Sequence, residues 1–142
     1  MLVFCHLERT EVNRLDTLAR RVRAKLGEHA GRVPKQELMS ALVLSGLELA
    51  LEPGTELVVK IAYGVRVEYR LSQADLARIE VFQQSKLPKS VSRMSRGKVQ
   101  AAMVRLALRH AEKDEGFITE DLVPRFPRAL LVELVGPPVS GG

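Results

Sequence analysis

The sequence is poor in the residues that build several common kinds of site. Its one cysteine, Cys5, excludes an internal disulfide and a zinc site made from several cysteines. With no tryptophan, two tyrosines and four phenylalanines, a stacking surface for single-stranded nucleic acid is not expected. No apolar run approaches the ~20 residues of a membrane-spanning helix, and the first residues do not resemble a signal peptide. We therefore expect a protein of a reducing, bacterial-type cytoplasm with no membrane segment.

Motifs of catalysis and metal binding are also missing. The three histidines, His6, His29 and His110, do not have the spacing of metal ligands. There is no phosphate-binding glycine loop, no nucleophile elbow and no paired-carboxylate signature. No neighbour marks Cys5 as a nucleophile, and we interpret it as a small core residue. The sequence thus predicts no enzymatic activity, no cofactor and no metal site.

Positive charge is present and unevenly distributed. The 142 residues carry a formal net charge of +5, in a chain long enough for one domain or two small repeats. Residues 1–52 hold +1, residues 53–63 zero, residues 64–113 +7 and residues 114–142 −3. A concentrated basic segment points to a polyanionic partner, although a solvated charged surface gives the same composition.

Two segments of the chain follow one pattern. Residues 32–50 align without a gap with residues 93–111, at an offset of 61 positions. Each copy reads as strand, helix, loop, helix, and residues 65–71 alternate apolar with charged residues as a half-buried strand does. Ser72 and Ser95 are the predicted N-caps of the two helices of the second copy. The first helix of copy one is predicted to be about one turn longer than its counterpart.

This pattern predicts a mainly α fold with a short antiparallel β-ribbon. A unit of about 45 residues buries too little surface to be stable alone, so the two strands are expected to pair and the four helices to share a core. β-prone segments, 56–62 and 128–135, follow each second helix. The chain is thus divided into copy one at 1–52, a β-prone linker at 53–63, copy two at 64–113, and an acidic and apolar extension at 114–142 with a disordered end.

A family resemblance is carried by residues 66–72, by the apolar positions of the helix that follows them, and by residues 95–99. Weaker counterparts of these segments lie in residues 7–19 and 35–38. In order and residue type they resemble the ribbon–helix–helix family of DNA-binding proteins. Two such units in one chain look like the tandem ribbon–helix–helix proteins of conjugative plasmids. The resemblance implies a pseudo-dimer that binds double-stranded DNA, as a transcriptional regulator or an accessory factor of a plasmid or chromosome, and leaves open self-association on the DNA.

In this family the outward face of the ribbon reads bases in the major groove, which a two-stranded ribbon fits. The resemblance assigns that role in copy two to Arg66, Glu68 and Arg70. Matching Leu7 to Leu71 turns Leu2, Phe4 and His6 outward in copy one, with Phe4 facing a thymine methyl and His6 donating a hydrogen bond. Since this half carries no positive charge, a non-palindromic site is expected. Alternatively, this face binds protein, or the strand lies in the other register, which would exchange its faces.

Phosphate binding is expected at the N-termini of the second helices, where free N–H groups and the helix dipole favour anions. The candidates are Arg93, Ser95, Arg96 and Lys98 in copy two, and Arg32 and Lys35 in copy one. The basic run at 20–25 is either a solvated helix face or a flanking phosphate contact.

Two other functions remain open. The chain is alternatively a protein-interaction module, such as an antitoxin or accessory factor that grips a partner through residues 114–135. Within that segment, Phe117, Ile118, Leu122, Val123 and Phe126 are interpreted as covering the core rather than docking a partner. The second alternative is a module that captures an anionic small ligand on the same basic face.

Overall fold

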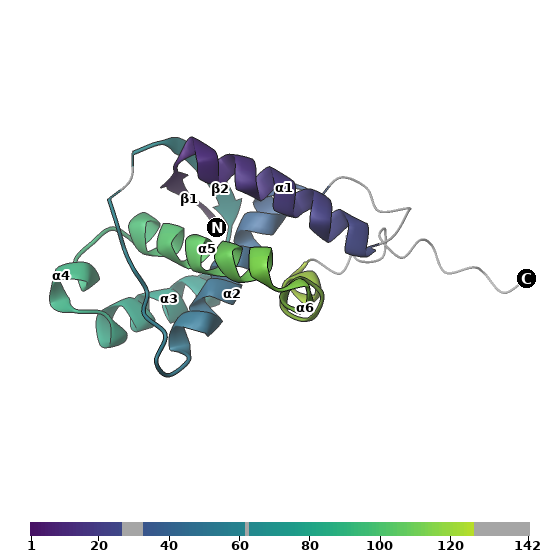
Figure 1. The fold of residues 1–142 in the computed structure, drawn as a ribbon. Coiled ribbons are helices and arrows are strands. Elements are labelled where there is room, and N and C mark those ends of the chain that lie inside the picture. Colours follow the sequence, from purple (N-terminus) through teal and green to yellow (C-terminus); the bar gives the residue numbers. More distant parts are fainter. Residues whose placement is uncertain (27–32, 62, 127–142) are drawn as a thin grey trace, which may run out of the picture.

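A computed structural model describes residues 1–26, 33–61 and 63–126. It is mainly helical, with a two-stranded antiparallel sheet (Figure 1). One strand–helix–helix order occurs twice. The elements are β1 (Leu2–Leu7), α1 (Arg9–Leu26), α2 (Lys35–Leu51), β2 (Val65–Arg70), α3 (Gln73–Lys86), the short α4 (Lys89–Ser92), α5 (Arg96–Lys113), α6 (Glu115–Phe117), η1 (Ile118–Leu122) and η2 (Val123–Arg125).

The spacing of the helices follows the repeat seen in the sequence. From Lys35, where α2 begins, to Arg96, where α5 begins, is 61 positions, the offset of the sequence alignment. From Arg9 to Gln73, the starts of α1 and α3, is 64 positions. α1 has 18 residues and α3 has 14, which confirms the predicted extra turn in copy one.

Ion pairs at equivalent positions extend the repeat to the side chains. In each copy a carboxylate of the first helix binds the first residue of the second helix, Asp16 with Lys35 at 3.6 Å and Glu80 with Arg96 at 3.5 Å. In each copy an arginine of the first helix binds a glutamate on the other copy's second helix, Arg14 with Glu112 and Arg78 with Glu48. The two arginines are at equivalent positions of the repeat, whereas the two glutamates are not. Ion pairs thus join corresponding helices in both copies, although exposed pairs of this kind contribute little stability.

The two strands pair within the chain, as the sequence predicts. Phe4 lies opposite Glu68 in the middle of the ribbon, and Cys5 lies opposite Val67. Cys5, Leu7 and Tyr69 are fully buried against the helices, whereas Phe4 and Glu68 are exposed. The inward and outward faces predicted for copy one are thus confirmed, and the alternative register is excluded.

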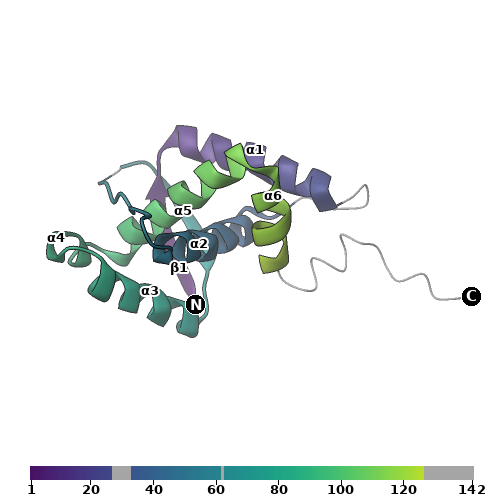
Figure 2. The same ribbon diagram turned by 60° about the horizontal axis from the view of Figure 1, so that its bottom comes forward.

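The core lies between the ribbon and the helices, and α2 and α5 form its centre. The two helices cross so closely that a Cβ atom added at Gly46 would lie 2.1 Å from the carbonyl oxygen of Met103. α5 runs between α1 and α3 in both views (Figures 1 and 2). Leu42, Leu47, Met103 and Leu108 are buried in this layer. The closely crossing helices α2 and α5 therefore pack against the inner face of the ribbon.

The prediction of a β-strand in the linker was wrong for the residues that the structure describes. The described residues of the predicted β-prone linker, 53–61 and 63, form no strand. After Gly54, whose φ of 82° suits glycine, the chain runs over the core with Leu57 and Val59 partly buried and Val58 exposed. An extended segment that packs on the core through every second residue has the same alternation of apolar and exposed residues as a β-strand. The sequence pattern therefore does not distinguish such a segment from a strand.

The extension after α5 covers the core, as interpreted from the sequence. Phe117, Ile118, Leu122 and Phe126 are buried, and Val123 packs against them. α6 lies at the end of the molecule away from α4 (Figures 1 and 2). The strand predicted at 128–135 and the disordered end lie outside the described residues. Among those residues, no helix combines the length and apolar character that a membrane crossing requires.

Candidate nucleic-acid interface

The outer face of the ribbon presents six side chains to solvent. The cross-strand pairs on this face are Leu2 with Arg70, Phe4 with Glu68, and His6 with Arg66. Leu2 is 49% and Phe4 44% exposed, and the other four residues are exposed as well. Because side chains alternate along a strand, all six project from one surface. The structure thus brings together every residue predicted to read bases.

Four of these side chains form a cluster over the middle of the ribbon. The guanidinium carbon of Arg66 lies 3.9 Å from the centre of the Phe4 ring, and Arg66 Nη2 lies 3.3 Å from Glu68 Oε1. Phe4 and His6 make an edge-to-face contact, with ring centres 5.8 Å apart. An exposed cation–π contact contributes about 0.5–1 kcal/mol. Arg66 is therefore pre-oriented, whereas the Arg70 side chain forms no ion pair with the described residues.

The N-termini of α2 and α5 lie beside the ribbon, each against the strand of the other copy. The Ser40 hydroxyl of α2 donates a hydrogen bond to the Arg70 carbonyl oxygen of β2, at 2.7 Å. A Cβ atom at Gly97 of α5 would lie 3.1 Å from the carbonyl oxygen of Phe4 in β1. The predicted phosphate-binding ends therefore flank the predicted base-reading face.

Ser95 occupies the N-cap position of α5, as predicted, but its side chain makes no capping hydrogen bond. Since the first amides of a helix have no partner within the helix, this end keeps donors for an anion. Arg96 is exposed and Lys98 half-buried on the first turn, and Arg93 is exposed just before it. Copy two thus presents the predicted set.

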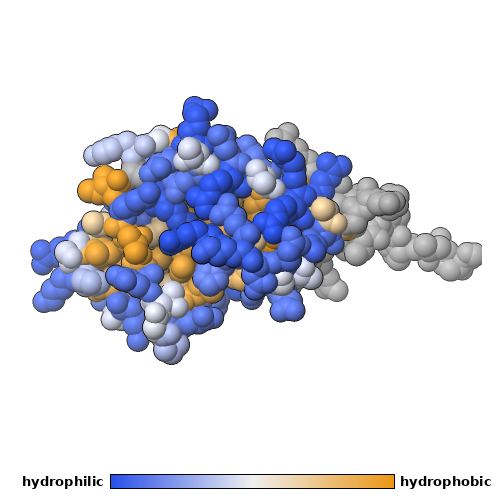
Figure 3. Space-filling model, in the orientation of Figure 1, coloured by the Kyte–Doolittle hydropathy of each residue, from blue (hydrophilic) through white to orange (hydrophobic). Residues whose placement is uncertain are grey.

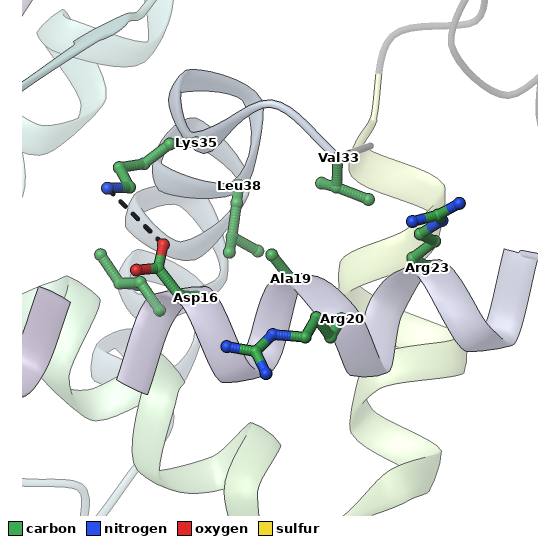
Figure 4. Close-up of a pocket in the computed structure, with 8 residues that line it drawn as sticks. Asp16, Ala19, Arg20, Arg23, Val33, Lys35 and Leu38 are labelled. Atoms are coloured by element: carbon green, nitrogen blue, oxygen red, sulfur yellow. Dashed lines mark ion pairs between the residues drawn. The ribbon is translucent and has the colours of Figure 1, made fainter. Parts of the chain in front are cut away.

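The equivalent end of copy one is less basic. Figure 4 shows a pocket between α1 and the start of α2, in which Lys35 and Asp16 point toward one another. Arg20 and Arg23 of α1 also line this pocket. The Asp16 carboxylate balances the one described cation predicted for phosphate binding in this copy. The other candidate, Arg32, lies outside the described residues.

The basic run of α1 has a role that the sequence did not predict. Arg21 and Lys25 bind the Glu115 carboxylate of α6, each at 2.7 Å. The hydrogen bonds from Lys25 and Arg21 lower the pKa of Glu115 to about 2. Two cations of the run therefore hold the C-terminal extension against α1. Only the position of Glu115 in the fold reveals this contact, since 90 residues or more separate the partners in sequence.

A buried ion pair beside β1 was also missed. Glu11 of α1 and Arg105 of α5 are 5% and 9% exposed, and Arg105 Nε donates to Glu11 Oε2 at 2.5 Å. Burial opposes ionisation of Glu11, but the hydrogen bonds from Arg105 and from the Glu8 amide outweigh it and lower its pKa. Glu11 also completes the N-terminus of α1 by accepting from the Glu8 amide at 2.8 Å. The pair joins α1 to α5.

Cys5 is a core residue, as interpreted from the sequence. Its side chain is 1% exposed, and burial raises the pKa of the thiol to about 11. Beside it, the buried Tyr69 hydroxyl donates to Gln100 Oε1. Within residues 1–26, 33–61 and 63–126, no three metal-binding side chains come together. Comparison of the chain with protein-family models, with curated proteins and with solved structures gave no match.

Proposed function

We propose that the chain is a tandem ribbon–helix–helix protein that binds double-stranded DNA through the β1–β2 ribbon. The observation that carries this proposal is the solvent face of the ribbon, with Arg66, Glu68 and Arg70 on β2 and the starts of α2 and α5 beside it. A two-stranded ribbon has the width of the major groove of B-DNA. A cytoplasmic transcriptional regulator or a plasmid or chromosome accessory factor is the biological role that fits this activity.

The side chains of the ribbon match the chemistry of base edges. Arginine forms a bidentate contact with guanine O6 and N7, and glutamate accepts from cytosine N4. Arg66 and Arg70 are thus the proposed guanine readers, and Glu68 the cytosine reader. Phe4 contributes apolar contact with a thymine methyl, and His6 a hydrogen bond. Arg93, Ser95, Arg96, Lys98 and Lys35, with Arg32, bind phosphates and set the register.

The fold of a single chain supports this use. Phe4 and Glu68 pair in the middle of the ribbon, so one chain presents both strands of a ribbon without a second subunit. The ion pairs Arg14–Glu112 and Arg78–Glu48 cross between the copies and fix their relative position. A preformed ribbon loses little conformational entropy on binding, which favours affinity.

A salt titration of duplex binding tests the proposal. Each neutralised phosphate adds about 0.9 to the slope of log affinity against log salt, so affinity is expected to fall steeply with salt. Arg96→Ala should weaken binding about equally on all sequences, whereas Arg70→Ala should relax sequence preference, at about 1–3 kcal/mol for a lost guanine contact. Site selection from a random duplex pool reads out the preference. A duplex affinity that does not change with salt would refute the proposal.

The exposed apolar side chains of β1 favour a second candidate function. Leu2 and Phe4, 49% and 44% exposed, give this half of the ribbon a surface that also suits a protein partner. On this reading the chain is an antitoxin-like or accessory module, and co-purification of one defined protein whose capture is lost in Leu2→Ser would support it. If site selection enriches no DNA sequence, the result would favour this protein-interaction function over DNA binding.

A further inference from the structure

A long groove runs beside β1, and the sequence did not predict it. Its volume is about 670 Å³, and it lies between β1, residues 60, 61, 63 and 64, and the first turns of α5. Hydrophobic surface gathers at the end of the molecule that the linker crosses (Figures 1 and 3). The linker contributes Lys60, Ile61, Tyr63 and Gly64 to the groove, and α5 contributes residues 96–98 among others.

The charged residues that line this groove are all basic. They are Lys60, Arg96, Lys98 and Arg105, and no described Asp or Glu is among the lining residues. Lys60 binds Glu8 at 3.0 Å and Arg96 binds Glu80 at 3.5 Å, but the side chains of Lys60 and Arg96 remain 48% and 59% exposed. A concave surface lined by one sign of charge attracts the opposite charge. The groove therefore suits an anion.

Arg105 adds a buried positive charge to the wall of the groove. It lines the groove while 91% of its surface is buried, and its Nε is bound to Glu11. Its two terminal nitrogens, Nη1 and Nη2, have no hydrogen-bond partner among the described residues. Both nitrogens are closed to solvent, so a ligand in the groove does not reach them, and Arg105 contributes only its positive charge to the groove.

The groove lies on the β1 flank of the ribbon. The stretch after α5 is the counterpart of the linker, and it packs on α1 instead, where Arg21 and Lys25 hold Glu115. Tyr63, 91% exposed, places an aromatic ring and a hydroxyl at the rim of the groove beside Lys60. The linker thus adds a wall to the β1 side of the ribbon.

We propose that this groove binds a phosphate group, and that the phosphate belongs to the DNA backbone on the β1 flank of the ribbon. Lys60 and the Tyr63 hydroxyl bind it from the linker, and Lys98 binds it from α5. The proposal rests on the proposed function and adds to it an anchor on the β1 flank. The same chemistry would also accept a small organic phosphate, and the experiment separates the two sources.

The experiment compares Lys60→Ala and Tyr63→Phe with wild type in duplex binding by fluorescence anisotropy. Lys86→Ala is the matched control, since Lys86 is exposed at the end of α3 and does not line the groove. We expect Lys60→Ala to weaken binding about three- to tenfold and to lower the salt slope by about 0.9, with Lys86→Ala unchanged. Tyr63→Phe removes one hydrogen bond and should weaken binding without changing the slope.

Duplexes with a single neutral methylphosphonate locate the contact. One backbone position on one flank should weaken wild-type binding and have no further effect on Lys60→Ala. Equal duplex binding by wild type and both linker variants would refute the proposed phosphate contact in the groove and leave the proposed function intact. If wild type does not bind duplex DNA, both proposals are refuted. Equal losses in Lys60→Ala and Lys86→Ala would also overturn the groove.

Thermal unfolding with ATP as the probe, at constant ionic strength, tests the other source. No change in the melting temperature of wild type is expected. A rise that Lys60→Ala abolishes, together with unchanged duplex binding in that variant, would assign the groove to a small phosphate ligand and overturn the DNA contact.

Discussion

Replacing Gly46 by alanine is expected to destabilise the protein, although alanine is the better helix former. Gly46 lies in the middle of α2, where this helix crosses α5 under the ribbon. A Cβ atom at this position would lie 2.1 Å from the carbonyl oxygen of Met103, 2.6 Å from its carbonyl carbon and 2.7 Å from its Cα atom. All three are backbone atoms of α5, so no side chain can rotate to make room.

The magnitude follows from two opposed effects. Ordinary contact begins near 3.4 Å, so the helices must separate by roughly 1 Å at their crossing, and overpacking of this kind costs about 1–3 kcal/mol. Alanine returns at most about 1 kcal/mol of helix propensity. We therefore expect a net loss of about 1–2 kcal/mol, which for a chain of this length lowers the melting temperature by about 3–8 °C.

The neighbouring residue provides the matched variant. The Ser45 hydroxyl is buried and has no hydrogen-bond partner among the described residues, so Ser45→Ala removes an unsatisfied group from the same helix. Its stability should stay the same or rise by up to about 1 kcal/mol. Urea unfolding followed by circular dichroism measures both variants. A Gly46→Ala protein as stable as wild type would show that the crossing is looser than described.

Three further predictions concern buried and clustered groups. Glu11→Gln removes the counter-ion of buried Arg105 and should cost about 3–5 kcal/mol in urea unfolding. Because the folded pKa of Glu11 lies below its ordinary 4.5, its contribution is complete above pH 4.5 and is lost as pH falls through the folded value, so the variant's stability should depend less on acid pH. Cys5, with a pKa of about 11, should react with a thiol reagent at pH 8 only at the rate of unfolding. In duplex binding, Phe4→Ala and Arg66→Ala should have non-additive effects, since Phe4 orients Arg66; strict additivity would contradict that contact.

The elements predicted correctly are those with local causes. Ser72 caps α3 by accepting from the Asp75 amide at 3.0 Å, and a serine before an apolar stripe is a signal that depends on nearby residues alone. The alternation of Val65, Val67 and Tyr69 determines which side of β2 is buried. From these signals and the repeat, the pairing of the two strands and the outward residues of the ribbon could be predicted.

The groove and the buried ion pair could not be predicted, because both depend on contacts between distant segments. Glu11 and Arg105 are 94 positions apart, and either one alone looks like an exposed charge on a helix. The alternation of the linker arises from Leu57 and Val59 resting on the core, which period alone cannot separate from a strand. Likewise, the contact of Arg66 with Phe4 follows from the strand register, which the sequence left open between two alternatives.

Two differences between the copies lie beside β1. By the offsets of the repeat, Glu11 corresponds to Asp75 and Arg105 to Leu44, and Asp75 instead lies 3.7 Å from Arg78 on its own helix. The linker likewise lines the groove on the flank of β1. A symmetric ribbon would bind an inverted repeat equally in two orientations. Under the proposed DNA-binding function, the flank and the predicted base-reading face both differ between the copies, so we expect one orientation on DNA to be favoured. A selected site that is a perfect inverted repeat centred on the ribbon would contradict this prediction.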